Sequence, residues 1–273
     1  MSKAFKSRRS ALFVPAANAR ALEKARGLAA DVIILDLEDA VAPQEKEQAR
    51  ASAADAVRSF AAHETVIRVN AVGTPWHHED MAAAAAAQPD AILLPKLTSA
   101  GEIEAARMKA RGVPLWAMIE TPRAVQHVNA IADSGVVCLM LGSNDLLQAL
   151  DARHRPDRAN LHAAMSLTVL AARAAGIGVI DGVHNALDDT AALVAACTMA
   201  RDFGFDGKSV IHPSQIGVAN ISFSPSAEET DYARRVLDAF AAQPGKGVIA
   251  LDRRMLETLD AEIAARTLAR AGL

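Results

Sequence analysis

Eight short apolar runs recur along the chain, and they constrain its fold more than any other feature of the sequence. The runs are continuous rather than alternating, which is typical of strands buried on both faces of a parallel sheet. Alanine-rich amphipathic stretches separate them, and we expect these to form helices. The strand-like runs lie at residues 11–14, 32–35, 65–69, 91–94, 115–119, 136–141, 178–180 and 208–211, and the helical stretches include residues 18–28, 44–60, 101–111 and 160–175.

The alternation of strand-like and helical segments predicts an α/β fold, and eight such units favour a (β/α)8 TIM barrel. A doubly wound open sheet is the alternative, but no Gly-x-Gly-x-x-Gly motif follows the first run. After His212 the pattern changes to two helical stretches, at residues 227–242 and 251–269. We therefore expect a catalytic barrel over residues 8–216 and a C-terminal helical extension over residues 217–273, placed to cover the barrel mouth or to contact a neighbouring subunit.

The composition argues against several classes of partner. The formal net charge is -3, and basic residues cluster only near the N-terminus, so no nucleic acid is expected. No apolar run approaches the roughly 20 residues that span a bilayer. Cys138 and Cys197 belong to no metal-binding or redox motif, which fits a reducing compartment. These features predict a soluble, cytoplasmic protein that acts on a small molecule, with no membrane partner.

Polar side chains follow most of the strand-like runs. The carboxyl ends of barrel strands form a single rim, where the active site of such a fold is built, so these side chains should gather there. Several are acids, and like charges held close together resist ionising unless a cation or a shared proton relieves them. The predicted rim residues are Asp36, Glu38, Asp39, Arg68, Asn70, Lys96, Glu120, Ser143, Asn144, Asp145 and Asp181.

A hard divalent cation would explain this collection of acids. Mg²⁺ takes oxygen ligands, usually one or two carboxylates together with water or substrate. Glu120 and Asp145 follow adjacent strands and are the expected metal ligands. Asp36, Glu38 and Asp39 would form an outer shell that orients those ligands. No histidine pair has a zinc-site spacing, because His77 and His78 are neighbours in an expected loop.

Each candidate also has a purely structural interpretation. Glu120 could be a negative charge at a helix N-terminus, and Asp145 could cap the helix that begins near Leu146. Arg68 could neutralise the acids as a structural ion pair. Lys96 and Lys208 could act as Schiff-base nucleophiles, although lysines near strand ends more often pair with acids. Structural roles are also expected for His184 and His212.

Seven segments of the chain, in order and with matching spacing, resemble the citrate lyase beta-subunit-like family, which includes malyl-CoA and citramalyl-CoA lyases. The resemblance runs from Arg8 to Ile216 and continues weakly into the tail. Several long motifs in register are more specific than any single one. The segments are RRSALFVPAANARALEKA, VIILDLEDAVAPQEK, VIRVN, AILLPK, MIETPRAV, LGSNDL and GFDGKSVIHPSQI.

The resemblance implies a TIM barrel, assembled as a homotrimer or a related oligomer such as a hexamer. It implies cleavage or formation of a carbon-carbon bond in a 3-hydroxyacyl-CoA with Mg²⁺, Mn²⁺ being a possible substitute, and acetyl-CoA plus pyruvate or glyoxylate as products. Glu120 and Asp145 would bind the metal, with Glu120 also touching substrate. Arg68 would contact substrate and act in catalysis with Glu38 and Asp39, while Asp36 would line the site.

Two positions depart from the family pattern. In relatives the tail often carries an Asp that can reach a neighbouring subunit's site, whereas this chain has Glu257 in the matching stretch Arg-Arg-Met-Leu-Glu. Asn144 stands where many relatives have Glu, which removes one acid beside the cluster. Two other activities stay open: a metal aldolase acting on free 2-oxo acids, and a citrate-lyase-type subunit that acts on a carrier-bound thioester.

Overall fold

The computed structural model describes residues 6–273, and its centre is a closed barrel of eight parallel strands. Every strand pairs with its sequence neighbours, and the last strand pairs with the first, so the sheet has no free edge. The (β/α)8 prediction is confirmed, with strand ends within two residues of those expected. The strands are β1 (Ser10–Pro15), β2 (Val32–Asp36), β3 (Glu64–Arg68), β4 (Ala91–Leu94), β5 (Leu115–Ile119), β6 (Cys138–Leu141), β7 (Gly178–Asp181) and β8 (Gly207–Val210).

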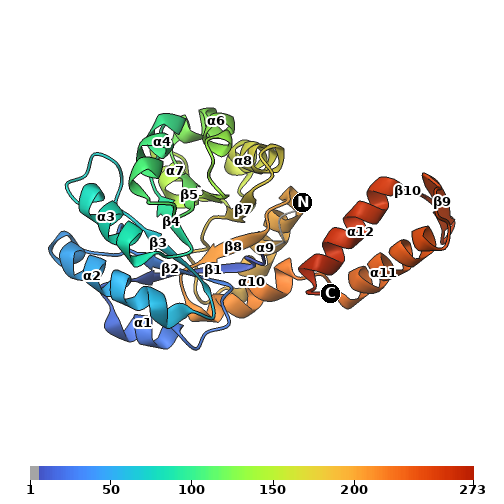
Figure 1. Cartoon of the computed structure of the whole chain (residues 1–273), viewed down its shortest axis with the longest axis horizontal. Helices are drawn as coiled ribbons and strands as arrows, with labels where there is room; N and C mark the ends of the chain where they lie inside the picture. The colour runs from blue at the N-terminus through green and yellow to red at the C-terminus, as the bar shows by residue number, and fades with distance from the viewer. Residues whose placement is uncertain (1–5) are drawn as a thin grey trace. The chain divides into compact units, whose positions relative to one another are not determined.

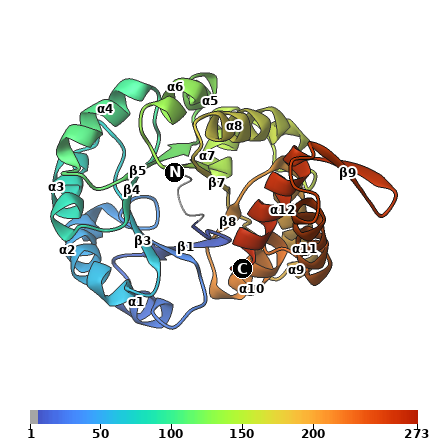
Figure 2. The ribbon, with the colours of Figure 1, turned by 45° about the vertical axis from the view of Figure 1, so that its right-hand side comes forward.

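Helices surround the barrel, as Figures 1 and 2 show. The expected loop at His77 and His78 is wrong, because both residues lie in the first turn of α3. There the His77 ring bonds the Asn70 carbonyl oxygen through Nδ1 at 2.8 Å, and the alanine run that follows favours a helix. The helices are α1 (Ala19–Ala25), α2 (Lys46–Ala56), α3 (His77–Ala87), α4 (Ala100–Lys109), α5 (Pro122–Gln126), α6 (Val128–Asp133), α7 (Ser143–Ala149), α8 (His162–Ala174), α9 (Thr190–Phe203) and α10 (Ile216–Phe223).

Alternate residues of the strands fill the barrel interior, as the two-residue side-chain period requires. They form one buried, mostly aliphatic cluster that includes Val32, Ile34, Val66, Leu93 and Ile180. Side chains rather than a channel therefore occupy the middle of the barrel.

Arg8 reaches this interior from the amino ends of the strands. Its guanidinium donates two hydrogen bonds of 2.8 Å to the Glu64 carboxylate and lies 4.8 Å from the centre of the Trp116 ring. A Cβ atom at Gly178 or Gly207 would overlap the side chain or the backbone of Arg8. The two glycines make room for the arginine, which closes this end of the barrel.

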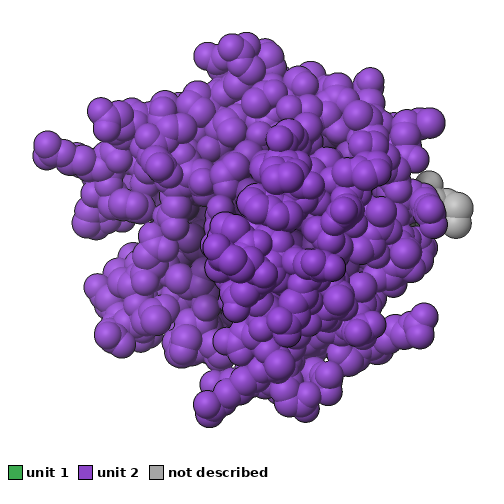
Figure 3. Space-filling model, turned by 90° about the vertical axis from the view of Figure 1, so that its left-hand side faces the viewer, with its two compact units in different colours: residues 1–7, 221–273 green, residues 8–220 purple. Residues whose placement is uncertain are grey.

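The chain divides into two compact units, of which residues 8–220 form the larger. Figure 3 shows one face of that unit, with a hollow in its surface. The second unit comprises residues 221–273 together with Lys6 and Ser7 among the described residues. No helix within residues 6–273 is both long enough and apolar enough to cross a bilayer.

The second unit is a helical hairpin whose connection is a two-stranded antiparallel ribbon. It contains α11 (Ala227–Ala241), β9 (Val248–Leu251), β10 (Arg254–Glu257) and α12 (Thr258–Arg270). The helix expected over residues 251–269 is therefore wrong in its first part. Asp252 and Arg253 have φ of 48° and 63°, and this left-handed backbone reverses the chain between the two strands. The small core of the unit consists of Ala233, Val236, Ile249, Leu256 and Ala264.

We expect Arg8→Met to lower the free energy of unfolding by about 3 kcal/mol, because breaking a buried ion pair leaves a desolvated charge behind. The side chains of Arg8 and Glu64 are only 12% and 3% exposed. Urea denaturation would measure the change. The control is Arg155→Met, which breaks the exposed pair with Asp157 and should leave the midpoint unchanged. Equal midpoints for Arg8→Met and the wild type would contradict this role of Arg8.

Candidate functional site

The carboxyl ends of β2 and β3 carry a buried ion pair. Asp36 and Arg68 are paired residues at the last position of each strand. Arg68 donates from Nε to Asp36 Oδ1 at 2.7 Å and from Nη2 to Oδ2 at 2.6 Å. Burial acts to raise the pKa of Asp36, but the guanidinium and the amides of Glu38 and Ala40 outweigh it and hold that pKa below its usual value. Asp36 thus fixes the orientation of Arg68.

Glu38 lies between two cations. Its Oε2 is 3.0 Å from Arg68 Nη1, and its Oε1 accepts a 2.6 Å hydrogen bond from Lys96 Nζ. The contact to Arg68 is an ion pair without hydrogen-bond alignment, since Glu38 Oε2 makes no hydrogen bond. Burial raises the pKa of Glu38, and the two cations only partly offset this effect.

Asp39 is the accessible member of the acid group. Its side chain is 51% exposed, whereas that of Glu38 is 6% exposed. It accepts a 2.9 Å hydrogen bond from Lys96 Nζ and lies 3.5 Å from Arg68 Nη1. A small molecule entering the rim would therefore meet Asp39 before Glu38.

The two candidate nucleophilic lysines are both paired with acids. Burial acts to lower the pKa of Lys96, but its hydrogen bonds to Glu38 and Asp39 outweigh burial and raise that pKa above its usual value. Lys208 donates to Asp181 Oδ2 at 2.6 Å and to the Gly182 carbonyl oxygen at 2.7 Å. A Schiff-base nucleophile needs a neutral amine, so the ion-pair interpretation suits both lysines better.

Glu120 follows β5 and is 1% exposed. Its Oε1 accepts the Lys96 backbone N–H at 2.6 Å, whereas its Oε2 has no hydrogen-bond partner. Burial raises the pKa of Glu120 to about 8, and the nearby charges of Asp145 and Glu38 add to this rise. Thr121, the next residue, is the N-cap of α5, so Glu120 lies just before this short helix without capping it. A Cβ atom at Gly142 would overlap the Glu120 carboxylate, so this glycine leaves the space that the carboxylate occupies.

Asp145 lies in the first turn of α7 but does not cap the helix. The N-cap residue is Gly142 and the helix begins at Ser143 rather than near Leu146, so the alternative interpretation of Asp145 as the helix cap is wrong. The Asp145 side chain is 29% exposed, and its Oδ1 is 3.7 Å from Lys96 Nζ. The negative charge of Asp145 contributes to the raised pKa of Glu120.

These two carboxylates fit the donor set of a magnesium ion. Within residues 6–273 no three His, Cys, Asp or Glu side chains are grouped so as to hold a metal. Mg²⁺ does not need three, since it usually keeps water or substrate oxygens beside one or two carboxylates. The buried Oε2 of Glu120 has no hydrogen-bond partner, and this favours a cation there because a buried polar atom without a partner is costly.

Two other predicted rim residues, Asp181 and Asn144, form hydrogen bonds to residues outside the acid group. Asp181 is buried and accepts two hydrogen bonds of 2.7 Å from Arg158, in addition to the one from Lys208. Asn144, in the first turn of α7, and Asn185, in the loop after β7, exchange hydrogen bonds of 3.1 and 2.9 Å. Sequence reasoning missed Arg158 and Asn185, because neither follows a strand-like run or belongs to a recognisable spacing.

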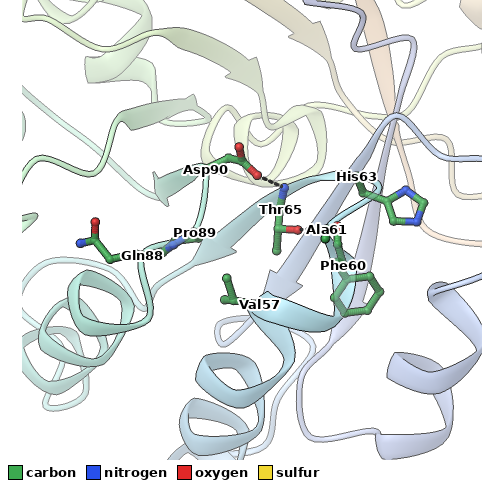
Figure 4. Close-up of a pocket in the computed structure, with 8 residues that line it drawn as sticks. All are labelled: Val57, Phe60, Ala61, His63, Thr65, Gln88, Pro89 and Asp90. Carbon is green, nitrogen blue, oxygen red and sulfur yellow. Dashed lines mark hydrogen bonds between the residues drawn. The ribbon is translucent and has the colours of Figure 1, made fainter.

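A separate pocket of about 220 Å³ lies at the opposite end of the barrel strands (Figure 4). Its lining comes from the segments that precede and begin β3 and β4, which mark the amino ends of the strands. In this fold residues at that end usually serve stability. The pocket is therefore not the candidate site. Its lining residues are Val57, Phe60, Ala61, His63, Thr65, Gln88, Pro89 and Asp90.

Glu120→Gln should stabilise the metal-free protein at high pH. Above pH 8 the folded protein holds an ionised, buried carboxylate, which costs about 1.4 kcal/mol for every unit by which burial raises its pKa. As pH falls from 8 towards 4.5 the folded state binds the proton before the unfolded state, so the cost disappears. We expect a variant more stable than wild type by a few kcal/mol at pH 8.5 in EDTA, and by much less near pH 5.

Urea denaturation at both pH values would measure this difference. Glu104→Gln, at an exposed position of α4, is the control and should show no pH-dependent difference. A Glu120→Gln variant that gains nothing at pH 8.5 would contradict the account of the buried carboxylate.

The sequence is similar to those of known proteins. The family model for HpcH/HpaI aldolase/citrate lyase matches residues 9–213. A (3S)-malyl-CoA thioesterase from Cereibacter sphaeroides is 44% identical over 268 residues, covering 96% of this chain and 94% of that protein. The citrate lyase subunit beta of Escherichia coli is 32% identical over 285 residues, covering 98% of this chain and 94% of that protein.

A solved structure resembles almost the whole chain. The protein CitE from Mycobacterium tuberculosis, in complex with magnesium, acetoacetate and coenzyme A, superposes with a TM-score of 0.82 at 33% identity and covers 97% of this chain and 98% of its own. The family model matches the residues that form the barrel strands, and the two relatives align with nearly the full length of this chain. The chain belongs to the HpcH/HpaI aldolase/citrate lyase family.

Proposed function

We propose that this protein is a Mg²⁺-dependent lyase that cleaves, or forms in the reverse direction, the carbon-carbon bond of a 3-hydroxyacyl-CoA such as malyl-CoA or citramalyl-CoA. The observation that carries the proposal is the buried, unpartnered oxygen of Glu120 on the same rim as the oriented guanidinium of Arg68. The Glu120 carboxylate suits a cation, and the Arg68 guanidinium suits an anion. A hydroxy acid thioester would need both a metal ion for its hydroxyl and carboxylate groups and a positive group for its thioester oxygen.

Glu120 and Asp145 would hold the metal. When bound, Mg²⁺ would supply Lewis-acid polarisation of the substrate hydroxyl and its adjacent carboxylate, an effect worth several kcal/mol. Support for the metal comes from the donor set and from the magnesium present with the CitE structure.

Arg68 would stabilise the charge that develops on the thioester. When the carbon-carbon bond breaks, its electron pair moves into the thioester to give an enolate oxygen, and an oxyanion needs a preorganised donor. Arg68 is always charged and carries five N–H donors, two of which are directed to Asp36 in bonds of 2.6 and 2.7 Å. The enolate carbon then takes a proton, giving acetyl-CoA beside glyoxylate or pyruvate.

Glu38 and Asp39 would handle the hydroxyl proton. A general base must lie within reach of the proton it takes and have a pKa near the working pH. Asp39 is the more exposed of the two carboxylates and therefore the more accessible to substrate, whereas burial raises the pKa of Glu38 above its usual value. We propose that Asp39 accepts the proton and that Glu38 keeps Arg68 and Lys96 in place.

Hydrolysis of the same thioester is the second candidate, favoured by the 44% identity to a (3S)-malyl-CoA thioesterase. Water would attack the thioester carbonyl, the CoA thiolate would leave with a proton, and free malate would result. Arg68 would face an oxyanion in this reaction as well. The free 2-oxo acid aldolase and the subunit acting on a carrier-bound thioester lack a comparable observation.

The C-terminal unit is proposed to take part in a homo-oligomer, a trimer or a hexamer. Met255, Leu259 and Ile263 expose apolar side chains on β10 and α12. Glu257, which stands where relatives often carry an Asp, forms the capping box at the start of α12 with Asp260. A carboxylate used in this way is less suited to reach a neighbouring subunit's site.

Incubation with (3S)-malyl-CoA and with racemic citramalyl-CoA separates the candidates. A lyase releases acetyl-CoA and glyoxylate or pyruvate without free thiol, whereas a thioesterase releases free CoA thiol and the hydroxy acid. We expect acetyl-CoA release that requires Mg²⁺ and stops with excess EDTA. Thiol release alone would favour hydrolysis. No turnover of either ester by folded protein would count against both CoA-based proposals.

Glu120→Ala and Asp145→Ala should each remove Mg²⁺-dependent turnover while leaving the fold intact, because each deletes a carboxylate from a site with only two. Turnover at increasing Mg²⁺ and thermal melting would be compared with wild type. The matched control is Asp133→Ala, an exposed acid at the end of α6. Wild-type turnover in both variants would overturn the metal assignment.

A further inference from the structure

We propose that Lys46 is a positioning residue, whose ammonium group fixes the backbone of residues 37–39 so that Glu38 and Asp39 face Arg68 and Lys96. Lys46 is the first residue of α2 and is 5% exposed. It lies outside the rim residues that follow the strands. The proposal rests on the proposed function only for its catalytic consequence.

The contacts of the Lys46 ammonium group use its full donor capacity. Nζ donates to the Leu37 carbonyl oxygen at 2.8 Å, to the Glu38 carbonyl oxygen at 2.7 Å and to Asn70 Oδ1 at 2.6 Å. An ammonium group has three N–H bonds, so each one has an acceptor. The Trp76 ring, whose centre is 5.2 Å from Nζ, contributes a further contact.

A buried ammonium group at the start of a helix is unfavourable for stability. We therefore infer that Lys46 has a functional role. None of the three acceptors is a carboxylate, although buried charges are normally paired. A cation at a helix N-terminus also opposes the helix dipole. Burial lowers the pKa of Lys46, while Asp36 and Glu38 act in the opposite direction. Local rules broken in this way are expected at functional sites.

The segment is held from both sides. The N–H groups of residues 37 and 38 donate to the last residues of β3 and β2. Leu37 N donates to the Arg68 carbonyl oxygen at 3.0 Å, and Glu38 N donates to Asp36 Oδ1 at 2.9 Å. Its carbonyl groups bond to Lys46. Peptide groups fixed in both directions leave the Glu38 and Asp39 side chains little freedom to turn.

Asn70 anchors the same segment to a second helix. Its Nδ2 donates to the Leu37 carbonyl oxygen at 2.9 Å and to Asp80 Oδ2 at 2.6 Å. Asp80 is fully buried on α3 and also accepts from Arg50 Nε at 2.8 Å. The chain from α3 through Asn70 to Lys46 therefore ties the acid segment to two helices.

The test compares Lys46→Met with wild type by hydrogen exchange and by kinetics. We expect the amides of residues 37–41 to exchange at least tenfold faster in the variant, while the amides of β5 keep their protection. We also expect kcat to fall about a hundredfold, because a misplacement of about 1 Å at a reacting group has an effect of that size. The Mg²⁺ dependence should stay that of wild type, since Glu120 and Asp145 are untouched.

The control is Arg8→Met, which also replaces a buried cation of the barrel but at its other end. It should reduce stability without a selective change in residues 37–41 and without a change in kcat. Lys46→Arg keeps the charge, yet a planar fork does not reproduce the three convergent bonds. It should therefore show the same local exchange and the same loss of kcat, and it replaces Lys46→Met if that variant fails to fold.

Unchanged protection of residues 37–41 in folded Lys46→Met or Lys46→Arg would overturn the proposal. A folded Lys46 variant with the kcat of wild type would overturn the claim that this positioning matters for catalysis. If wild type turns over neither CoA ester, the proposed function fails, while the exchange measurement still decides whether Lys46 holds the segment.

Discussion

The ion pair between Arg68 and Asp36 is the interaction on which the rim depends. Five carboxylates, those of Asp36, Glu38, Asp39, Glu120 and Asp145, lie near Arg68 and Lys96, and the Lys46 ammonium group is a further cation beside Asp36 and Glu38. Arg68 and Lys96 donate hydrogen bonds to the acids at the end of β2, whereas Asp145 approaches Lys96 only to 3.7 Å and Glu120 Oε2 has no hydrogen-bond partner. Mutual repulsion would otherwise disfavour so many acids at one end of a barrel. The hydrogen bonds of Arg68 and Lys96 therefore hold the acids at the end of β2 together at the rim.

Much of the fold could be predicted from the sequence, because strands buried on both faces have continuous apolar runs in their sequence. The run VIILD became β2 and LWAMI became β5, with closure following from their number. The ribbon of β9 and β10 could not be predicted, since Asp252 and Arg253 give no Asn-Gly or Asp-Gly signal for a tight turn. Short strands in a small unit depend on packing that local sequence does not encode.

The rim residues could be listed from the sequence, but their partners could not. Asp36, Glu38, Asp39, Arg68, Glu120 and Asp145 were expected at the strand ends, and they lie there. The sequence suggested that Arg68 and Lys96 could pair with acids but not with which ones, and in the structure Asp36, Glu38 and Asp39 are their hydrogen-bond and ion-pair partners. Ion pairs join residues about 30 to 60 positions apart, as in Arg68 with Asp36 and Lys96 with Glu38. No spacing rule reaches over such separations.

The raised pKa of Glu120 makes the protonation of the rim depend on pH near neutrality. With a pKa of about 8, its carboxyl group holds a proton at neutral pH when no other cation is present. A divalent ion that binds there has to expel this proton, so acidification competes directly with metal loading. If Glu120 is a metal ligand as proposed, the protein's metal content would fall as its surroundings become more acidic, and the space left by Gly142 is what lets the carboxyl group occupy this buried position.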